Sequence, residues 1–485
     1  METHTAPANP DQPGKIKRVY RWLFTWQRVR RTLVALVILA ALGVIVYAAE
    51  NRRGRRAWEN CRRELEANGE VLDWNKFVPE SIPDDQNIFK APKMTEWFVK
   101  ASGQNSQTKL SERLSNSETT ATITNREAAV AYLAWSDRQA DAFEIIRAGL
   151  KRPQARIDCD YRDPVTISIP NFVSLRYVAQ VLAQRARCHL LLNQPGEAAS
   201  DLTLIFDLRR LLNGSPITLV AAMINVAITG LYLDVVGEGI QQGAWTETER
   251  AVLETQLAQI QLPPLLPAAF RTERASISHI WVAVRPKIGA FFGWDSSGSR
   301  WKNYFEETRL FVNFAPSGWH DLNLVAFCKT HQLGIGIYDS EHQVMIPQRQ
   351  KAAEREVERR CAHPWPDGFL SALVFPNFAK ACQVTARNQT KVDQARVVFA
   401  LEKYRAIHGE YPQTLAALVP QFIANIPHDV IGGQPLKYQR TPDGQFLLYS
   451  IGWNETDDGG KAAFRKDGGS IAYDQGDWVW GTPAR

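Results

Sequence analysis

The chain has 485 residues, of which 45% are hydrophobic and 22% are charged. This balance is typical of globular proteins and excludes a disordered chain, and the length allows two or three hydrophobic cores. The formal net charge of +6 does not indicate nucleic-acid binding, because much of the basic surplus flanks one apolar segment near the N-terminus. We therefore expect no nucleic-acid partner.

The N-terminal apolar segment covers residues 32–49 and reads TLVALVILAALGVIVYAA, without a charge. Its length is close to the minimum that a helix needs to cross a bilayer. Aromatic side chains near its ends favour the headgroup layer, and they include Trp22, Phe24, Trp26 and Tyr47. The sequence thus predicts a basic tail at 1–31 and a single transmembrane helix at 32–49, with the lipid bilayer as its partner.

A cleaved signal peptide is the alternative interpretation, since Val46 and Ala48 suit a small-residue cleavage site. We favour an uncleaved signal-anchor because the preceding basic region is long and the apolar run exceeds the usual core of a signal peptide. Basic residues crowd both flanks, so the positive-inside rule separates the two orientations only slightly. We expect a cytoplasmic N-terminus, with the bulk of the chain outside the cytoplasm on the cell membrane.

The six cysteines are far apart and form no Cys-x-x-Cys motif, so they indicate no zinc site. Both disulfides and buried free thiols are compatible with their number. They are Cys61, Cys159, Cys188, Cys328, Cys361 and Cys382.

The region 50–124 mixes charges, prolines and a polar tract, which predicts a stalk and linker. Apolar residues then recur at three- and four-residue steps, which predicts a helical domain at 125–290. A second apolar stretch at 216–236 contains Asn225, Thr229 and Asp234. We interpret it as a buried core helix, with entry into the membrane as the alternative.

Within this domain, residues 185–212 read RARCHLLLNQPGEAASDLTLIFDLRRLL. The small residues Ala198 and Ala199 follow a turn at residues 193–196, and the pair resembles one tetratricopeptide unit. Because solenoids need about three repeats, a single unit favours an ordinary hairpin inside an irregular helical bundle. A tetratricopeptide-like adaptor is the alternative. Residues 291–365 follow as a helical or irregular connector.

The last segment, 366–485, changes character. A helical pattern ends at Gly409, which suits a helix C-cap. Alternating apolar and polar residues then surround the turn signal Pro442-Asp443-Gly444 and predict a small antiparallel sheet. The fold class we expect is α+β, mainly α: a transmembrane helix, a helical bundle, and a long helix with a small sheet.

Four stretches of this segment stand in the order ALEKYRAIHGEYPQTLAAL, IPHDVIGGQPLKY, FLLYSIGWNETDDGG and GDWVWG. In that order they resemble the globular domain of the major, G-type pseudopilins of type II secretion. The resemblance implies a pilin-like arrangement and envelope or secretion proteins as partners. A pseudopilin, however, begins with a peptidase site and a hydrophobic helix that carries an early glutamate and runs into the globular domain. This chain has neither, so polymerisation by the usual route is not expected.

The loop WNETDDGG offers the one ligand that side chains suggest. Asn454, Asp457 and Asp458 supply hard oxygens on a glycine-rich backbone, as calcium requires. The resemblance implies calcium in this loop, although Asn454 stands where an aspartate is expected. An acidic turn between two strands is the alternative interpretation.

The sequence contains no His-Glu-x-x-His, Gly-x-Ser-x-Gly, phosphate-binding loop or dinucleotide fingerprint. His279 and His320 are isolated and suit packing or hydrogen bonding. We therefore favour a non-enzymatic envelope protein, structural or partner-binding, with a link to secretion. The alternatives are a membrane-tethered hydrolase with its site in the helical domain, and a tetratricopeptide-like adaptor.

Overall fold

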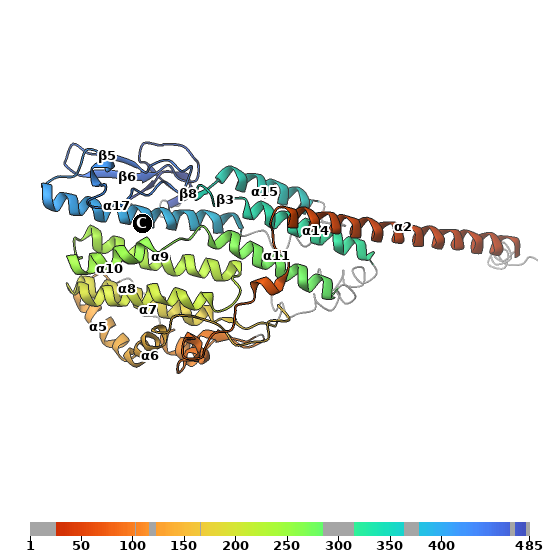
Figure 1. Ribbon diagram of the computed structural model, residues 1–485, viewed down its shortest axis with the longest axis horizontal. Coiled ribbons are helices and arrows are strands. Elements are labelled where there is room, and N and C mark those ends of the chain that lie inside the picture. Colours follow the sequence, from red (N-terminus) through yellow and green to blue (C-terminus); the bar gives the residue numbers. More distant parts are fainter. Residues whose placement is uncertain are drawn as a thin grey trace, which may run out of the picture. The chain divides into compact units, whose positions relative to one another are not determined.

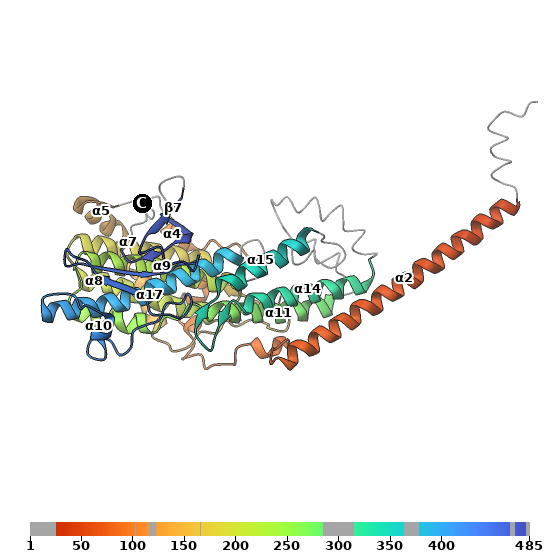
Figure 2. The same cartoon turned by 90° about the horizontal axis from the view of Figure 1, so that it is seen from above.

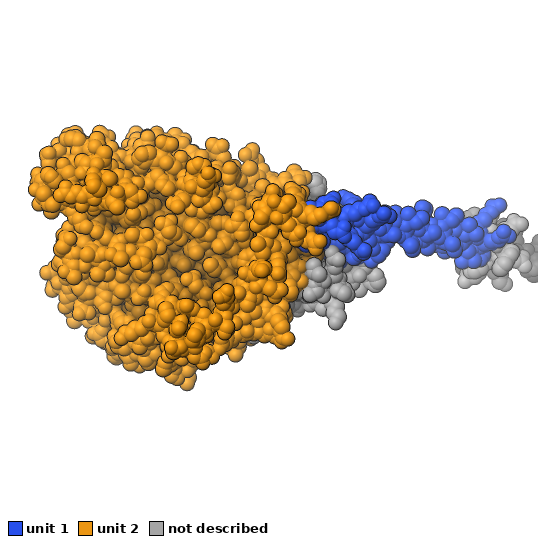
Figure 3. All heavy atoms as spheres, viewed as in Figure 1, with its two compact units in different colours: residues 1–61, 287–322 blue, residues 62–286, 323–485 orange. Residues whose placement is uncertain are grey.

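The computed structural model describes residues 26–101, 103–115, 123–164, 166–284, 315–362, 378–465 and 471–481. The chain divides into two compact units, residues 1–61 with 287–322 and residues 62–286 with 323–485 (Figure 3). The fold is mainly helical, with small antiparallel sheets, as the composition and periodicity predict. Most of the predicted basic tail and most of the connector up to residue 314 lie outside the described residues.

The first unit contains the N-terminal part of helix α2 (Trp26–Ala67), a long continuous helix in Figure 2. Every side chain of residues 30–49 is exposed, including the whole predicted membrane segment. The helix is long and apolar enough to cross a membrane, and its most apolar window is 0% buried. A protein surface in water rarely leaves so large an apolar area uncovered.

Directly after the apolar run, one face of α2 contacts the start of helix α14 (Ser317–Ile335). The Asn51 side-chain oxygen accepts a hydrogen bond of 3.0 Å from the Gly318 backbone N–H. The Trp319 indole donates to the Glu50 carboxylate at 3.1 Å. These contacts join the end of the exposed segment to the rest of the first unit.

Two glycines allow this close crossing. A Cβ atom on Gly54 would lie 2.0 Å from the carbonyl oxygen of Gly318, and a Cβ on Gly318 would meet the backbone of Glu50. Since real Cβ atoms do not approach that closely, only glycine fits at both positions.

In the second unit, three helix pairs follow one another in the chain and in space (Figure 1). The first helices of the pairs pack side by side in series, and so do the second helices. The pairs are α5 (Arg126–Asp137) with α6 (Ala140–Leu150), α7 (Phe172–Leu191) with α8 (Pro195–Leu208), and α9 (Leu219–Gln241) with α10 (Glu247–Ala258). Extensive packing between the two helices of one pair is found for α7 and α8, so the order alone does not establish a repeat.

The α7–α8 hairpin shows why these residues fold as they do. Asn171 caps α7 by accepting from the backbone N–H groups of Val173 and Ser174. Asn193 takes the left-handed conformation with φ 62°, and Pro195 occupies the first turn of α8. The helix-turn-helix expected in this region is therefore present.

The second apolar stretch forms α9, which packs against α7, α8, α11 (Leu265–Val284) and α17 (Phe378–His408). Its length and composition would also suit a membrane span, but 56% of its apolar window is buried. Helix α9 is thus a core helix, as we expected.

Residues of the region predicted as stalk and linker are largely packed into the second unit. The side chains of Trp74, Met94 and Phe98 are almost fully buried. The segment includes the short helices η1 (Trp74–Phe77), η2 (Ile88–Lys90), α3 (Met94–Phe98) and α4 (Lys109–Leu114), and β1 (Val99–Lys100) pairs with β2 (Ile169–Pro170). The prolines and polar residues of this region separate large apolar side chains that insert into the core, so it is not an extended stalk.

A buried ion cluster fixes the start of this segment. The Glu70 carboxylate accepts from Arg271 Nε at 3.0 Å and from the fully buried Arg274 on α11. Burial alone would raise the pKa of Glu70, but the hydrogen bonds from the two arginines hold it below its ordinary value of 4.5.

Helix α17 covers α9 and α10, and its buried Val392 and Phe399 join the core of the helix pairs. It ends where expected, before Gly409 at φ 80°. The remaining helices are η4 (Arg209–Asn213), α15 (Pro347–Ala362) and η5 (Leu415–Leu418), and β3 (Tyr338–Asp339) pairs with β4 (Val344–Met345).

The C-terminal strands form two small antiparallel sheets beside α17. One has the order β5 (Lys437–Arg440), β6 (Phe446–Ser450), β9 (Trp478–Val479), and the other pairs β7 (Ala462–Phe464) with β8 (Ile471–Gly476). The predicted turn at residues 442–444 joins β5 to β6, with Gly444 at φ 79°. Among the cysteines whose side chains the structure describes, Cys159, Cys188 and Cys382 are free thiols.

Candidate functional site

The acidic loop between β6 and β7 contains the three predicted calcium ligands. Asp457 accepts hydrogen bonds from the Tyr449 hydroxyl at 2.9 Å and from the Gly459 N–H at 3.1 Å. Its other oxygen lies 3.3 Å from the Lys437 ammonium. Asn454 donates its amide to the Asp458 carboxylate at 3.0 Å. These groups therefore already satisfy one another.

Asp477, which sequence reasoning did not single out, organises the same loop. Its buried carboxylate accepts from the Gly460 N–H at 2.7 Å and from the N–H groups of Asp458 and Lys461 at 3.3 Å. Burial raises the pKa of Asp477. Within the described ranges, no group of three or more His, Cys, Asp or Glu side chains is placed to hold a metal ion. The contacts of Asn454, Asp457 and Asp458 with one another and with Lys437 favour the interpretation as an acidic turn, and calcium in this loop stays a prediction.

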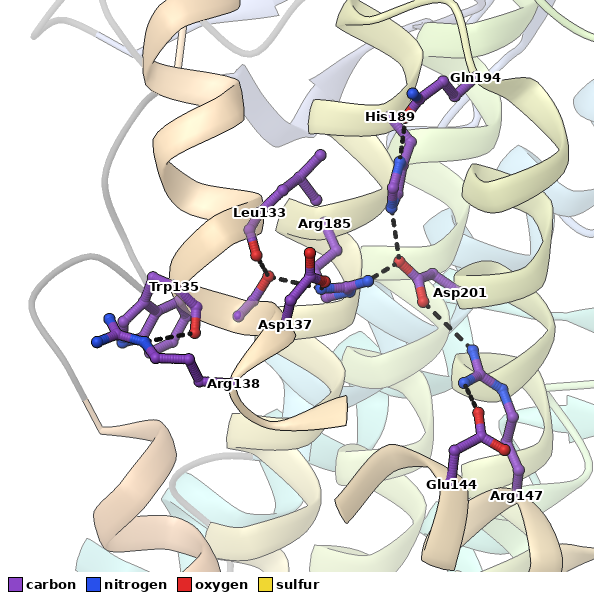
Figure 4. A network of polar contacts seen from close by, with 11 residues as sticks. Leu133, Trp135, Asp137, Arg138, Glu144, Arg147, Arg185, His189, Gln194 and Asp201 are labelled. Atoms are coloured by element: carbon purple, nitrogen blue, oxygen red, sulfur yellow. Dashed lines mark hydrogen bonds and ion pairs between the residues drawn. The ribbon is translucent and has the colours of Figure 1, made fainter. Parts of the chain in front are cut away.

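A second polar cluster lies inside the helix pairs, where Arg185 of α7 points toward Asp201 of α8 (Figure 4). Arg185 Nε lies 3.2 Å from one Asp201 oxygen, and Arg147 Nη2 lies 3.4 Å from the other. Burial raises the pKa of Asp201, against the opposing effect of Arg185, His189 and Arg147. Arg185 also donates to Asp137 at 2.6 Å.

His189 completes this cluster, with Nε2 3.8 Å from Asp201 and Nδ1 2.8 Å from the Gln194 side chain. A carboxylate, a histidine and arginines are also what a hydrolase site would use. Here, however, cations from two helices engage both oxygens of the Asp201 carboxylate, and Asp201 as a whole is 3% exposed. This geometry supports a structural role in joining α5, α6, α7 and α8.

The third candidate is a cavity of about 450 Å³, which we call the α9–α17 pocket. Its wall comes from α7, α9, α17, β8, β9 and the residues after β9. The lining residues include Arg187, Leu233, Asp234, Glu238, Gln241, Arg387, Thr390, Lys391, Gln394, Tyr473, Asp477 and Trp478.

Helical spacing gathers the polar side chains at this pocket. Arg387, Thr390, Lys391 and Gln394 occupy positions i, i+3, i+4 and i+7 of α17, which form one face of a helix. These polar residues interrupt the apolar pattern of α17, which otherwise contributes many side chains to the core. This polar stripe is the signal that sequence reasoning could have used to find the site.

Most charges in the pocket are paired. Arg187 Nε lies 3.0 and 2.9 Å from the two oxygens of Glu238. The Lys391 ammonium lies 2.7 Å from Asp234. The Asp477 carboxylate accepts the loop N–H groups described above.

Arg387 differs from these residues. Its Cζ lies 3.6 Å from the centre of the Tyr473 ring, over the ring face. Among the residues that the structure describes, its guanidinium has no hydrogen bond or ion pair. Burial lowers the pKa of Arg387, yet a guanidinium stays protonated in proteins. Arg387 is therefore the one pocket cation without a direct hydrogen bond or ion pair among the described residues, although the charge of the nearby Asp234 acts on it.

Thr390 is a second polar group without a partner, since its hydroxyl is buried and makes no hydrogen bond within the described part of the chain. Beside it, Gln394 donates to the Trp478 carbonyl at 2.7 Å, and the Trp478 indole donates to the Tyr473 carbonyl at 3.2 Å. These bonds fix the aromatic wall against α17.

Comparison with known proteins gives no family, no curated protein and no solved structure that matches this chain. The assignment of a site therefore depends on the geometry of the chain alone.

Proposed function

We propose that the protein is a single-pass membrane-anchored envelope protein that binds a partner through its folded body and is not an enzyme. The observation that carries this proposal is the α9–α17 pocket, in which Arg387 makes no direct hydrogen bond or ion pair with the described residues. A half-buried guanidinium whose N–H groups have no direct partner in the chain is available to an acceptor group of a ligand.

The anchoring part of the proposal is supported by α2. Its exposed apolar run needs a cover, and a bilayer provides one of the right thickness. The bulk of the chain then lies outside the cytoplasm, with envelope or secretion proteins within its reach.

The three stacked helix pairs support partner binding of the adaptor type, because stacked pairs of helices form extended binding surfaces. In this proposal the pilin-like resemblance applies to α17 and the sheets after it. Since α17 packs on α9 and α10, the module acts as one end of the body and not as a subunit of a pilus. The hydrolase alternative is less favoured because the carboxylates of the pocket are already paired.

Two measurements on the full chain test the proposal. A reporter that is active only outside the cytoplasm, fused after Arg485, should be active. A photo-crosslinking amino acid at the exposed Gln241, on the pocket wall, should form an adduct with an envelope protein in living cells. The same amino acid at Val130, which is 56% exposed on α5, serves as the control. An inactive reporter, or the same adducts from both positions, would contradict the proposal.

A further inference from the structure

Four arginines follow the exposed apolar run of α2 directly, and no acidic residue stands between them. All four side chains are exposed. We call them the arginine cluster of α2, and they are Arg52, Arg53, Arg55 and Arg56. The Glu50 carboxylate lies 3.2 Å from Arg53. The guanidinium groups of Arg52, Arg55 and Arg56 make no hydrogen bond or ion pair with the residues that the structure describes. The cluster thus presents three positive charges that the described chain leaves unpaired.

The helix keeps these charges away from its packed side. Gly54, Trp58 and Cys61 are buried, and their spacing of four and three residues places them on one face of α2. Because a helix has about 3.6 residues per turn, Arg52 and Arg56 lie about half a turn from Gly54, on the opposite face. Directly after the apolar run, α2 therefore has one face that contacts α14 and another that carries free cations.

The position of the cluster along α2 matches the headgroup layer of a bilayer. The apolar run ends at Ala49, and a rise of about 1.5 Å per residue places Arg52 about 4.5 Å and Arg56 about 10.5 Å beyond it. The headgroup layer adds about 5–7 Å on each side of the hydrocarbon core. Arginine side chains are long enough to bend back over such a difference. The whole cluster can therefore reach lipid phosphates.

The chemistry of the cluster indicates the class of lipid. The planar guanidinium fork matches two oxygens of a phosphate group. A zwitterionic headgroup carries its own cation beside the phosphate, whereas an anionic headgroup brings a net negative charge that three unpaired arginines can balance. The cluster also continues an apolar run that a bilayer would cover, so its anion is a lipid phosphate and not a soluble one.

We infer that the arginine cluster of α2 binds the phosphate groups of anionic phospholipids, in the leaflet at the C-terminal end of the apolar run. The inference rests on the anchoring part of the proposed function and deepens it by naming the lipid class. It gives the chain a preference among bilayers, which an apolar helix alone does not supply.

The test measures which lipids surround the anchor. The full chain is reconstituted in phosphatidylcholine vesicles with a trace of spin-labelled phosphatidylglycerol or spin-labelled phosphatidylcholine, and only chain that resists alkaline extraction is measured. Electron paramagnetic resonance gives the fraction of each label held at the protein. Phosphatidylglycerol should associate about 2- to 5-fold more strongly, since one arginine near an anionic surface contributes up to about a 5-fold preference and the label averages over all surrounding lipids.

The combined change Arg52→Gln, Arg55→Gln and Arg56→Gln should lower this preference by at least about half, because it removes the three unpaired cations. The matched control changes three exposed cations of α15, which has no apolar run beside it. It consists of Arg349→Gln, Lys351→Gln and Arg355→Gln and should keep the preference of the unchanged chain.

Four results would overturn the inference. Equal association of the two lipids with the unchanged chain does so without any variant. An unchanged preference in the α2 variant would place the lipid site elsewhere. Equal losses from both combined variants would assign the preference to net charge alone. Glycerol 3-phosphate that abolishes the preference, while sodium chloride of equal ionic strength does not, would assign the arginines to a soluble phosphate.

The outcome is separable from that of the proposed function. If the reporter after Arg485 is active and Gln241 forms its adduct while the two lipids associate equally, the proposed function stands and the lipid inference fails. If phosphatidylglycerol is preferred but the reporter is inactive or the adduct is missing, the lipid site stands and the proposed function fails. A chain that alkaline extraction removes from the vesicles would overturn both.

Discussion

The second unit contains two polar clusters in which an arginine lies against an aromatic ring. They differ in whether the arginine also bonds to carboxylates of the chain. In the α7–α8 cluster, Arg185 lies 5.6 Å from the Phe143 ring centre and bonds to Asp201 and Asp137. In the α9–α17 pocket, Arg387 lies against Tyr473 without any such bond among the described residues. The first arrangement is complete within the chain, whereas the Arg387 guanidinium makes no direct bond to a described residue. The comparison distinguishes an arginine that stabilises the fold from one that, in our proposal, belongs to a binding site.

The largest effect is expected where the charges are complete. Arg185→Met leaves the Asp201 carboxylate buried with weaker compensation, so the free energy of unfolding should fall by about 3–5 kcal/mol. Urea denaturation of the full chain in detergent, followed by tryptophan fluorescence, measures this. The control Glu144→Ala removes an exposed partner of Arg147 and should cost less than about 1 kcal/mol. Equal losses would remove the basis for calling the cluster structural.

Glu70 extends the comparison to a cluster in which two arginines hydrogen-bond to a single carboxylate. Glu70→Gln should lower the free energy of unfolding by about 1–3 kcal/mol at neutral pH, because Arg274 loses its charged partner. The folded pKa of Glu70 lies below 4.5, so its contribution is present above the unfolded pKa and is lost as the pH falls through the folded value. The difference between the unchanged chain and the variant should therefore shrink on acidification. A difference that grows toward low pH would show that the arginines do not hold this carboxylate charged.

Arg387→Met is the direct counterpart of Arg185→Met. Since it removes a half-buried cation that makes no direct hydrogen bond or ion pair with the described residues, the free energy of unfolding should rise or stay within about 1 kcal/mol. The same denaturation experiment measures it. A loss as large as that of Arg185→Met would mean that Arg387 has a structural partner, and it would weaken the argument for a binding pocket.

The two clusters also differ in how far the sequence reveals them. The α7–α8 hairpin was predictable, because the Asn193 turn and Pro195 act locally and Arg185 and Asp201 lie in the same predicted unit. The pocket was not, since Arg187, Asp234, Arg387 and Tyr473 come from four separate elements. Only the polar spacing of Arg387, Thr390 and Lys391 on α17 points to it.

The same limit explains why the sequence did not reveal that the three helix pairs lie side by side in series. Helix α9 is apolar on nearly all sides because α7, α8, α11 and α17 surround it, so it carries no repeat pattern that matches α7. The exposed part of α2, in contrast, was predictable from composition alone, since its length and lack of charge need no tertiary information. The packing of the segment after α2 was not predictable, because prolines and polar residues separate its large apolar residues in the sequence.

The smallest expected effect concerns the acidic loop, for which the sequence leaves both calcium binding and an acidic turn open. Asp457 faces the Lys437 ammonium, and Asn454 directs its amide at Asp458, so a calcium ion would have to displace both contacts. Adding calcium or a chelator should therefore leave the Tm of the full chain unchanged. Lys437→Met removes the competing cation and gives calcium its best opportunity to bind, because Asp457 then keeps only the Tyr449 and Gly459 contacts. A calcium-dependent rise in Tm in the variant but not in the unchanged chain would show that Lys437 occupies the place of the ion. A rise in the unchanged chain would restore calcium as a ligand of Asn454, Asp457 and Asp458.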